Sequence, residues 1–147
     1  MTPVKDTVWW NTPGGKVTEH RDQAGTSCSL MLYNDAGSVF FEWTGASAIV
    51  ATAINGNWRF PENSKMPVAM QMGDAWWSNG ADSTIIQDEG HGNAVSFTLN
   101  KPIGDLLRAA DHVLIRTRNA DLSIRLNPTK MTVLLSRAQA CRDVIKR

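Results

Sequence analysis

The sequence has little net charge and lacks a long uninterrupted apolar segment. Its 15 Lys and Arg residues nearly balance 14 Asp and Glu residues, which leaves a net charge of +1 at pH 7. Proteins that bind nucleic acid through its phosphates carry a clear excess of positive charge, so we expect no nucleic-acid partner. The most apolar stretch, residues 38–54, is interrupted by Glu42 and Gly45. We therefore expect no membrane span.

Familiar catalytic and cofactor motifs are also missing. The chain contains no G-x-S-x-G, H-E-x-x-H, P-loop or G-x-G-x-x-G pattern. Its histidines, His20, His91 and His112, are scattered, and no spacing around them is typical of a metal site. We expect no catalytic residue, cofactor or metal ion; a hydrolase that uses His91 or His20 in a scattered site is the distant alternative. Gly90 and Gly92 predict a loop tip with an exposed His91.

The N-terminal residues do not resemble a signal peptide. Residues 1–6 have neither a basic region nor an apolar one. Two interpretations stay open: a cytoplasmic protein, or a mature periplasmic or secreted domain whose leader is replaced by Met1. A length of 147 residues without a repeat or linker predicts a single β-rich domain over residues 1–147.

The two cysteines lie on patterns that both point inward. Cys28 shares one face of an expected strand with Leu30 and Leu32. Cys141 belongs to the apolar stripe of an expected helix. We predict a disulfide between Cys28 and Cys141; the alternative is two free buried cysteines.

Alternating hydrophobicity predicts β-structure along most of the chain. Turn signals such as Pro13–Gly15 separate short strands, which is typical of an antiparallel β-sandwich or a partly open barrel. We also expect a short helix near residues 103–110 and a C-terminal helix near 129–146. The expected strands are Thr7–Trp10, Lys16–His20, Cys28–Tyr33, Ser38–Thr44, Ala46–Ile54, Trp58–Phe60, Val68–Met72, Ala75–Ser78, Thr84–Gln87, Ala94–Leu99, His112–Thr117 and Leu122–Leu126.

One hairpin is specified in register. A two-residue turn at Asn119-Ala120 places opposite one another the pairs Arg118 and Asp121, Arg116 and Ser123, Ile115 and Ile124, and Val113 and Leu126. In this register the apolar side chains all face inward and the charged ones outward.

The outer face of this hairpin is a candidate binding surface for an anionic ligand or an acidic partner. It carries Arg116, Arg118 and Arg125, and arginine pairs bidentately with carboxylate and phosphate. Residues 101–147 hold ten of the basic residues and four of the acidic ones. The alternative is an ordinary solvated face on which Arg118 pairs with Asp121.

Tryptophan is unusually frequent, with six residues against one tyrosine. Trp9 and Trp10 are adjacent within an expected strand, as are Trp76 and Trp77. Neighbouring strand residues point to opposite faces, so one member of each pair is expected away from the core. An exposed Trp offers a platform for a sugar, a peptide or a protein; the alternative is that both sheet faces are covered and the pairs are core.

The order of several segments resembles that of the invasion-associated locus B proteins, which are small β domains exported to the bacterial envelope. The resemblance spans the chain in layout and rests on a Trp-bearing first strand, a closing helix and three segments: Cys28-Ser29-Leu30, Phe60-Pro61 through Met66-Pro67-Val68-Ala69-Met70, and Val95-Ser96-Phe97-Thr98-Leu99. It implies export, a disulfide and a non-catalytic role, and it transfers no functional residue. The chain departs from the family in placing Cys141 in a terminal helix and in lacking a second cysteine pair.

These observations together predict a non-catalytic periplasmic or secreted binding module of the bacterial envelope whose partner is a protein. Carbohydrate binding through the Trp residues is the alternative. A cytoplasmic location stays open as well.

Overall fold

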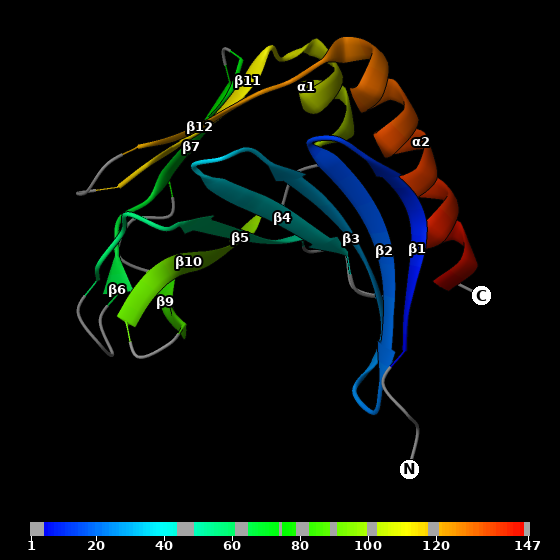
Figure 1. Ribbon diagram of the computed structural model, residues 1–147, viewed down its shortest axis with the longest axis horizontal. Helices are drawn as coiled ribbons and strands as arrows, with labels where there is room; N and C mark the ends of the chain where they lie inside the picture. The colour runs from blue at the N-terminus through cyan, green and yellow to red at the C-terminus, as the bar shows by residue number, and fades with distance from the viewer. Residues whose placement is uncertain are drawn as a thin grey trace.

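The computed structural model describes residues 5–43, 49–60, 65–73, 75–78, 83–88, 91–99, 103–117 and 121–145 (Figure 1). The larger of its two antiparallel sheets has eight strands in the order β1-β2-β3-β4-β5-β10-β9-β6. Their bounds are β1 Lys5–Thr12, β2 Gly15–Asp22, β3 Gly25–Tyr33, β4 Gly37–Trp43, β5 Ile49–Asn55, β6 Lys65–Met66, β9 Ser83–Asp88 and β10 His91–Leu99.

The smaller sheet has four strands in the order β12-β11-β7-β8. Within the described residues the larger sheet is not closed into a barrel, because its outer strands β1 and β6 do not pair with each other. The predicted mainly β class, the short helix and the C-terminal helix are confirmed. The remaining bounds are β7 Ala69–Met72, β8 Ala75–Ser78, β11 His112–Arg116, β12 Leu122–Arg125, α1 Gly104–Ala109 and α2 Pro128–Ile145.

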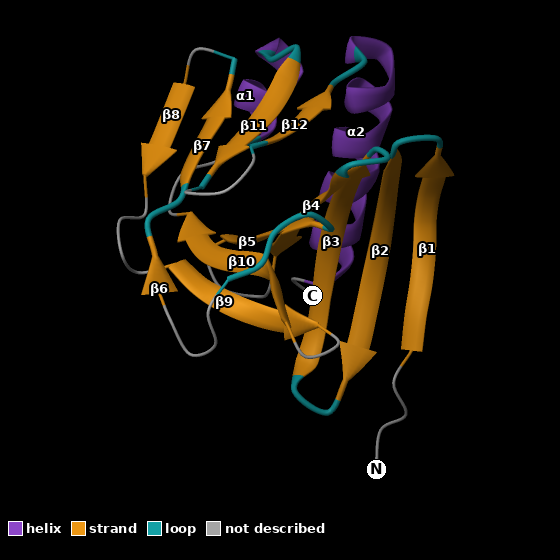
Figure 2. Ribbon diagram, turned by 60° about the vertical axis from the view of Figure 1, so that its left-hand side comes forward, coloured by secondary structure: helices purple, strands orange, loops and turns teal. Residues whose placement is uncertain are grey.

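The eight-stranded sheet is strongly arched. Its convex side faces α1, α2 and the four-stranded sheet, and its concave side faces away from them (Figures 1 and 2). An antiparallel sheet of this kind buries one face and leaves the other in contact with water. The arch therefore separates a core on its outer side from a solvated surface on its inner side.

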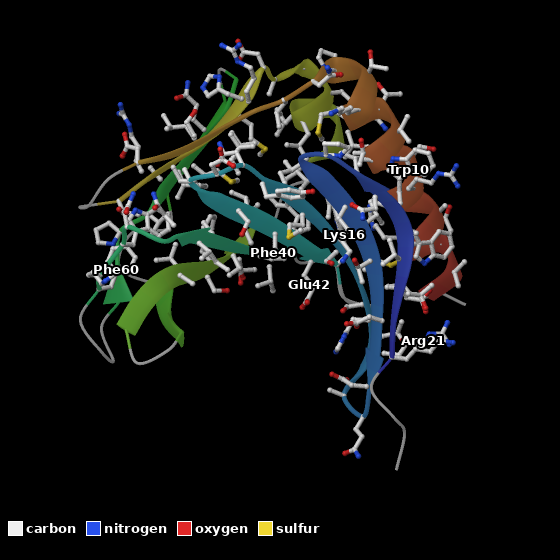
Figure 3. All side chains as sticks on the ribbon, viewed as in Figure 1. Trp10, Lys16, Arg21, Phe40, Glu42 and Phe60 are labelled. Atoms are coloured by element: carbon white, nitrogen blue, oxygen red, sulfur yellow. A yellow bond between two sulfur atoms is a disulfide. The ribbon has the colours of Figure 1, made fainter. Side chains whose placement is uncertain are left out.

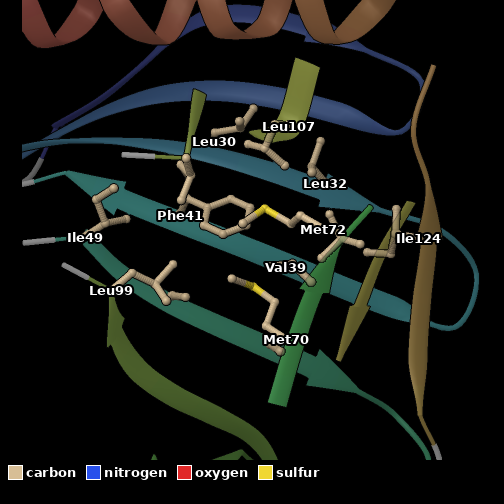
Figure 4. Packing of buried hydrophobic residues seen from close by; sticks show 14 of the residues in the cluster. Leu30, Leu32, Val39, Phe41, Ile49, Met70, Met72, Leu99, Leu107 and Ile124 are labelled. Carbon is tan, nitrogen blue, oxygen red and sulfur yellow. The ribbon is translucent and has the colours of Figure 1, made fainter. Parts of the chain in front are cut away.

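The core lies between the convex side of the arch and the elements that cover it. Leu30, Phe41 and Leu99 of the large sheet pack near Met70 and Met72 of β7, and all five side chains are at most 2% exposed (Figure 4). Burying one such side chain contributes roughly 1.5–3 kcal/mol. Alternation along most of β2–β5 sends apolar side chains from every second position into this cluster.

Helix α2 is fixed to the convex side along its length. The Asn127 side chain caps its first turn by accepting the Lys130 N–H at 3.0 Å. Leu134 packs onto Gly15, where a Cβ atom would lie only 2.5 Å from the leucine Cδ1. Cys141 is bonded to Cys28 of β3, with the two Cα atoms 6.1 Å apart, which confirms the predicted disulfide. Neither described helix is long and apolar enough to cross a membrane.

The predicted register of the β11–β12 hairpin is wrong by two residues. Ile115 pairs with Leu122 and Val113 with Ile124, instead of Ile124 and Leu126. Burial does not separate the two registers, because a shift of two residues keeps every side chain on its own face.

Two further strand assignments differ from the expectation. Residues Trp58–Phe60 do not form a strand; only Phe60 makes an isolated bridge, although Trp58 is fully buried. His91 lies in β10 rather than at a loop tip, because it continues the β9–β10 ladder opposite Asp88. The predicted strand Ala46–Ile54 is found as β5 from Ile49, and residues 44–48 lie outside the described part of the chain.

Candidate functional site

The concave side of the arch contains an open hollow of about 440 Å³. Strands β1 to β5 all contribute to it, and almost all of its side chains are half-exposed. A volume of this size falls within the usual range for sites that bind small ligands or short segments of chain. The hollow is lined by Asp6, Lys16, Thr18, His20, Ser29, Met31, Phe40, Glu42, Val50 and Thr52.

Strand register brings these side chains together in rows across the sheet. Directly paired residues project to the same face, so a row can be followed from strand to strand. One row, beginning on β2, is Lys16, Met31, Phe40 and Thr52. The next row is Thr18, Ser29, Glu42 and Val50.

The hollow combines an apolar floor with two opposite charges. Met31, Phe40 and Val50 supply the floor, whereas Lys16 and Glu42 extend into the concave space from β2 and β4 (Figure 3). Neither charged group makes an ion pair or a side-chain hydrogen bond with another described residue. Both therefore stay available to a molecule bound in the hollow.

A histidine between two carboxylates forms the rim next to β1. The His20 ring lies with Nδ1 2.5 Å from Asp6 Oδ1 and Nε2 3.0 Å from Asp22 Oδ2. These hydrogen bonds, first that to Asp6 and then that to Asp22, raise the pKa of His20 above its ordinary value. The contact with His20, together with the Ala24 N–H, lowers the pKa of Asp22.

The first tryptophan pair does not follow simple alternation. A β-bulge between Val8 and Trp10 leaves Trp9 unpaired, and both rings lie on the α2 side of β1. Trp9 packs against the core and donates its Nε1–H to Glu19 at 3.2 Å. Trp10 is 37% exposed, and the Arg137 guanidinium lies 4.8 Å from its ring centroid.

The other predicted surface residues are only partly placed. Trp76 and Trp77 lie in β8, opposite Gln71 and Met70, and their side chains lie outside the described part of the structure. Arg116 is exposed and lies 3.6 Å from Asp121, the partner predicted for Arg118. Arg125 is exposed on β12, and Arg118 lies outside the described residues. The hollow and the Arg face belong to different sheets, so the structure does not join them into one surface.

The described lining of the hollow offers a bound molecule apolar contact and two opposite charges. In the described ranges no three His, Cys, Asp or Glu side chains are grouped so that they could hold a metal ion. The hollow is not among the sites predicted from the sequence, although one signal is present: Met31 and Phe40 are large apolar residues at positions that alternation assigns to the polar face. No family model matches the chain, and no curated protein or solved structure matches it.

Proposed function

We propose that the protein is a non-catalytic binding module that holds an extended segment of a protein partner in the hollow of its arched sheet. The observation that supports this most is the pair of unpartnered opposite charges, Lys16 and Glu42, beside an apolar floor that no described residue covers. A half-buried surface of this kind offers both hydrophobic contact and orientation by charge.

A polypeptide fits the lining better than a sugar does. The hydroxyl groups of Thr18 and Ser29 have no hydrogen-bond partner among the described residues, so they are available to peptide groups. Among the described residues that line the hollow, Phe40 is the one Phe, Tyr or Trp, and one face of Trp10 is already occupied by Arg137. Sugar recognition through stacking would need a wider free aromatic surface.

The disulfide supports a location outside the cytoplasm. Cys28 and Cys141 are both fully buried and bonded, and such structural disulfides persist in oxidising compartments. We place the module in the periplasm or among secreted proteins, in keeping with the envelope-type layout of its sequence. Alkylation of the protein isolated from its native compartment tests this: thiols that react without prior reduction would contradict the proposed location.

Selection from a random peptide library tests the binding function directly. Peptides of about seven residues, displayed on phage, are selected on the folded protein and then tested on two variants. Thr52→Trp fills the hollow, whereas Thr132→Trp makes the same change on the exposed surface of α2, and each removes one side-chain hydrogen bond.

The expected result is that selected peptides bind the native protein and Thr132→Trp equally but lose at least about tenfold in affinity for Thr52→Trp, a difference of about 1.4 kcal/mol. Equal binding to both variants would exclude the hollow as the binding site. Enrichment of no peptide, with saturable binding of soluble cell-wall oligosaccharides instead, would favour the carbohydrate alternative.

A further inference from the structure

We infer that the hollow prefers segments in which an acidic and a basic side chain flank an apolar one at every second position. This inference rests on the proposed function and adds the chemical pattern of the partner. It follows from how Lys16 and Glu42 are spaced over the floor.

Lys16 and Glu42 do not form an ion pair with each other. Lys16 lies on β2 and Glu42 on β4, in neighbouring rows of the same face. Standard strand spacing and rise put their Cα atoms about 12 Å apart. Each charge is therefore free to pair with a ligand group of opposite sign.

An extended peptide matches this separation. Its side chains project to the same face at every second residue, so the first and fifth of five residues lie about 13 Å apart. An acidic group at one end reaches Lys16 while a basic group at the other reaches Glu42. The third side chain then lies over β3, against Met31 and Ser29, with Phe40 beside Met31 in the same row.

The remaining charged groups at the hollow do not change this assignment. Asp6 and His20 also line it, and Asp22 contacts the His20 ring from the same strand. The two carboxylates outnumber the one positive charge that His20 can carry, so this rim is net negative. It lies on the β1 side of the hollow, beyond Thr18 from Lys16, and it cannot replace Lys16 as the partner of an acidic group. The pattern therefore still follows from Lys16 and Glu42.

Labelled peptides of stated charge pattern test the inference. Each carries Leu at its third position, with Glu and Lys, Lys and Glu, two Glu or two Lys residues at positions one and five; both mixed orders are included because the strand direction is open. Fluorescence anisotropy at low salt is expected to show that the better mixed peptide binds about tenfold more tightly than either same-charge peptide.

Charge-reversal variants supply the internal control. Lys16→Glu should shift the preference to the peptide with two Lys residues, and Glu42→Lys to the peptide with two Glu residues. Glu42→Gln removes the charge while keeping the side-chain shape, and Lys16→Gln removes the charge with a shorter side chain. Both should lower the preference for the mixed peptide without reversing it. Thermal melting checks that each variant is folded.

The outcomes separate the two proposals. Equal binding of all four peptides, lost in Thr52→Trp, would overturn the charge pattern while leaving the peptide-binding function in place. Binding of none of them, alongside library peptides that do require the hollow, would also overturn the pattern alone. Absence of any peptide binding in both experiments would overturn the proposed function itself.

Discussion

At the residue scale, His20 links the edge strand β1 to β2 through its two carboxylate neighbours. Asp6 on β1 and Asp22 at the end of β2 both favour the charged imidazole, which raises the pKa of His20 above its ordinary value of 6.5. A raised pKa means that the folded state binds the proton more tightly than the unfolded chain does. The contribution of His20 to stability is therefore complete below pH 6.5 and is lost as the pH rises through the raised value.

We predict that His20→Gln is more destabilising at about pH 5.5 than at about pH 9. NMR titration of the His20 ring should place its midpoint above that of a free histidine, and Asp6→Asn should lower it because Asp6 is the larger cause. Urea denaturation at both pH values measures the difference in unfolding free energy. A pH-independent effect of the substitution would contradict the assigned role.

Asp22 determines the acidic pH limit of the stabilisation that the His20–Asp22 contact provides. Its pKa is lowered below the ordinary 3.8 by His20 and the Ala24 N–H, so its contribution is present above pH 3.8 and is lost as the pH falls through the lowered value. The contact between His20 and Asp22 should thus stabilise the fold most between pH 3.8 and pH 6.5, the ordinary pKa values of the two groups.

Glu19 is a buried carboxylate on the convex side of β2. It is 5% exposed, accepts the Trp9 indole N–H, and pairs with the Arg21 guanidinium. We predict that Glu19→Ala lowers the free energy of unfolding by roughly 1–3 kcal/mol, because the half-buried indole N–H is left without its acceptor.

Glu19→Gln is the matched variant, since it keeps an oxygen for Trp9 while removing the charge. It should cost less than Glu19→Ala in urea denaturation. If both substitutions cost the same, the ion pair with Arg21 rather than the indole hydrogen bond carries the effect.

At the scale of elements, the disulfide joins α2 to the third strand over a sequence separation of 113 residues. Closing so long a loop restricts the unfolded chain, and losing such a bond in a small domain typically costs 2–5 kcal/mol. We predict a loss of about 4 kcal/mol for the double variant Cys28→Ala with Cys141→Ala, measured by guanidinium denaturation.

Hydrogen exchange shows which part of α2 is destabilised when the disulfide is removed. The amides around Cys141 should exchange faster in the double variant, whereas those around Met131, near the capped start of α2, should change less. Uniform exchange along α2 would show that packing alone holds the helix.

The β-bulge in β1 brings Trp10 under α2. The guanidinium of Arg137 over the indole ring is expected to contribute about 0.5–1 kcal/mol as a cation–π contact at an exposed site. A double-mutant cycle with Trp10→Ala and Arg137→Ala should give a coupling energy of that size. Val8, which is 51% exposed and pairs with Thr18 of the hollow, is the control and should show no coupling to Arg137.

Local patterns were sufficient for most strands and both helices, because alternation and helical periodicity report directly which side chains are buried. They failed where burial gives no information. The β11–β12 register is one such case, because pairing Ile115 with Leu122 sends the same side chains inward as pairing it with Ile124 would. The bulge at Trp9 depends on Glu19 and α2, which are distant in sequence.

At the scale of the whole molecule, the hollow depends on the curvature of the sheet. A polar strand face has the same sequence pattern whether the sheet is flat or arched. Alternation therefore predicts that Lys16 and Glu42 lie on the solvated face. It does not predict that both side chains line the same hollow. Met31 and Phe40 can be recognised as lining residues of a hollow only once the arched arrangement of β2 to β5 is known.

Two adjacent phenylalanines lie on opposite faces of the arched sheet. Phe41 is fully buried in the core, whereas Phe40 is half-exposed on the floor of the hollow. We predict that Phe41→Ala lowers the free energy of unfolding by about 3–5 kcal/mol, as expected for a large core side chain. Phe40→Ala should cost about 1 kcal/mol or less, because its ring already contacts water.

Urea denaturation of the two variants, with peptide binding measured in parallel, separates stability from function. Phe40→Ala should remain folded and lose affinity for the peptides that occupy the hollow, which makes it a functional variant rather than a structural one. Equal costs at the two positions would mean that Phe40 is buried in solution and that a second copy or another segment covers the concave side. The hollow would then be an interface within an assembly, because a free binding surface cannot carry the stability of a core residue.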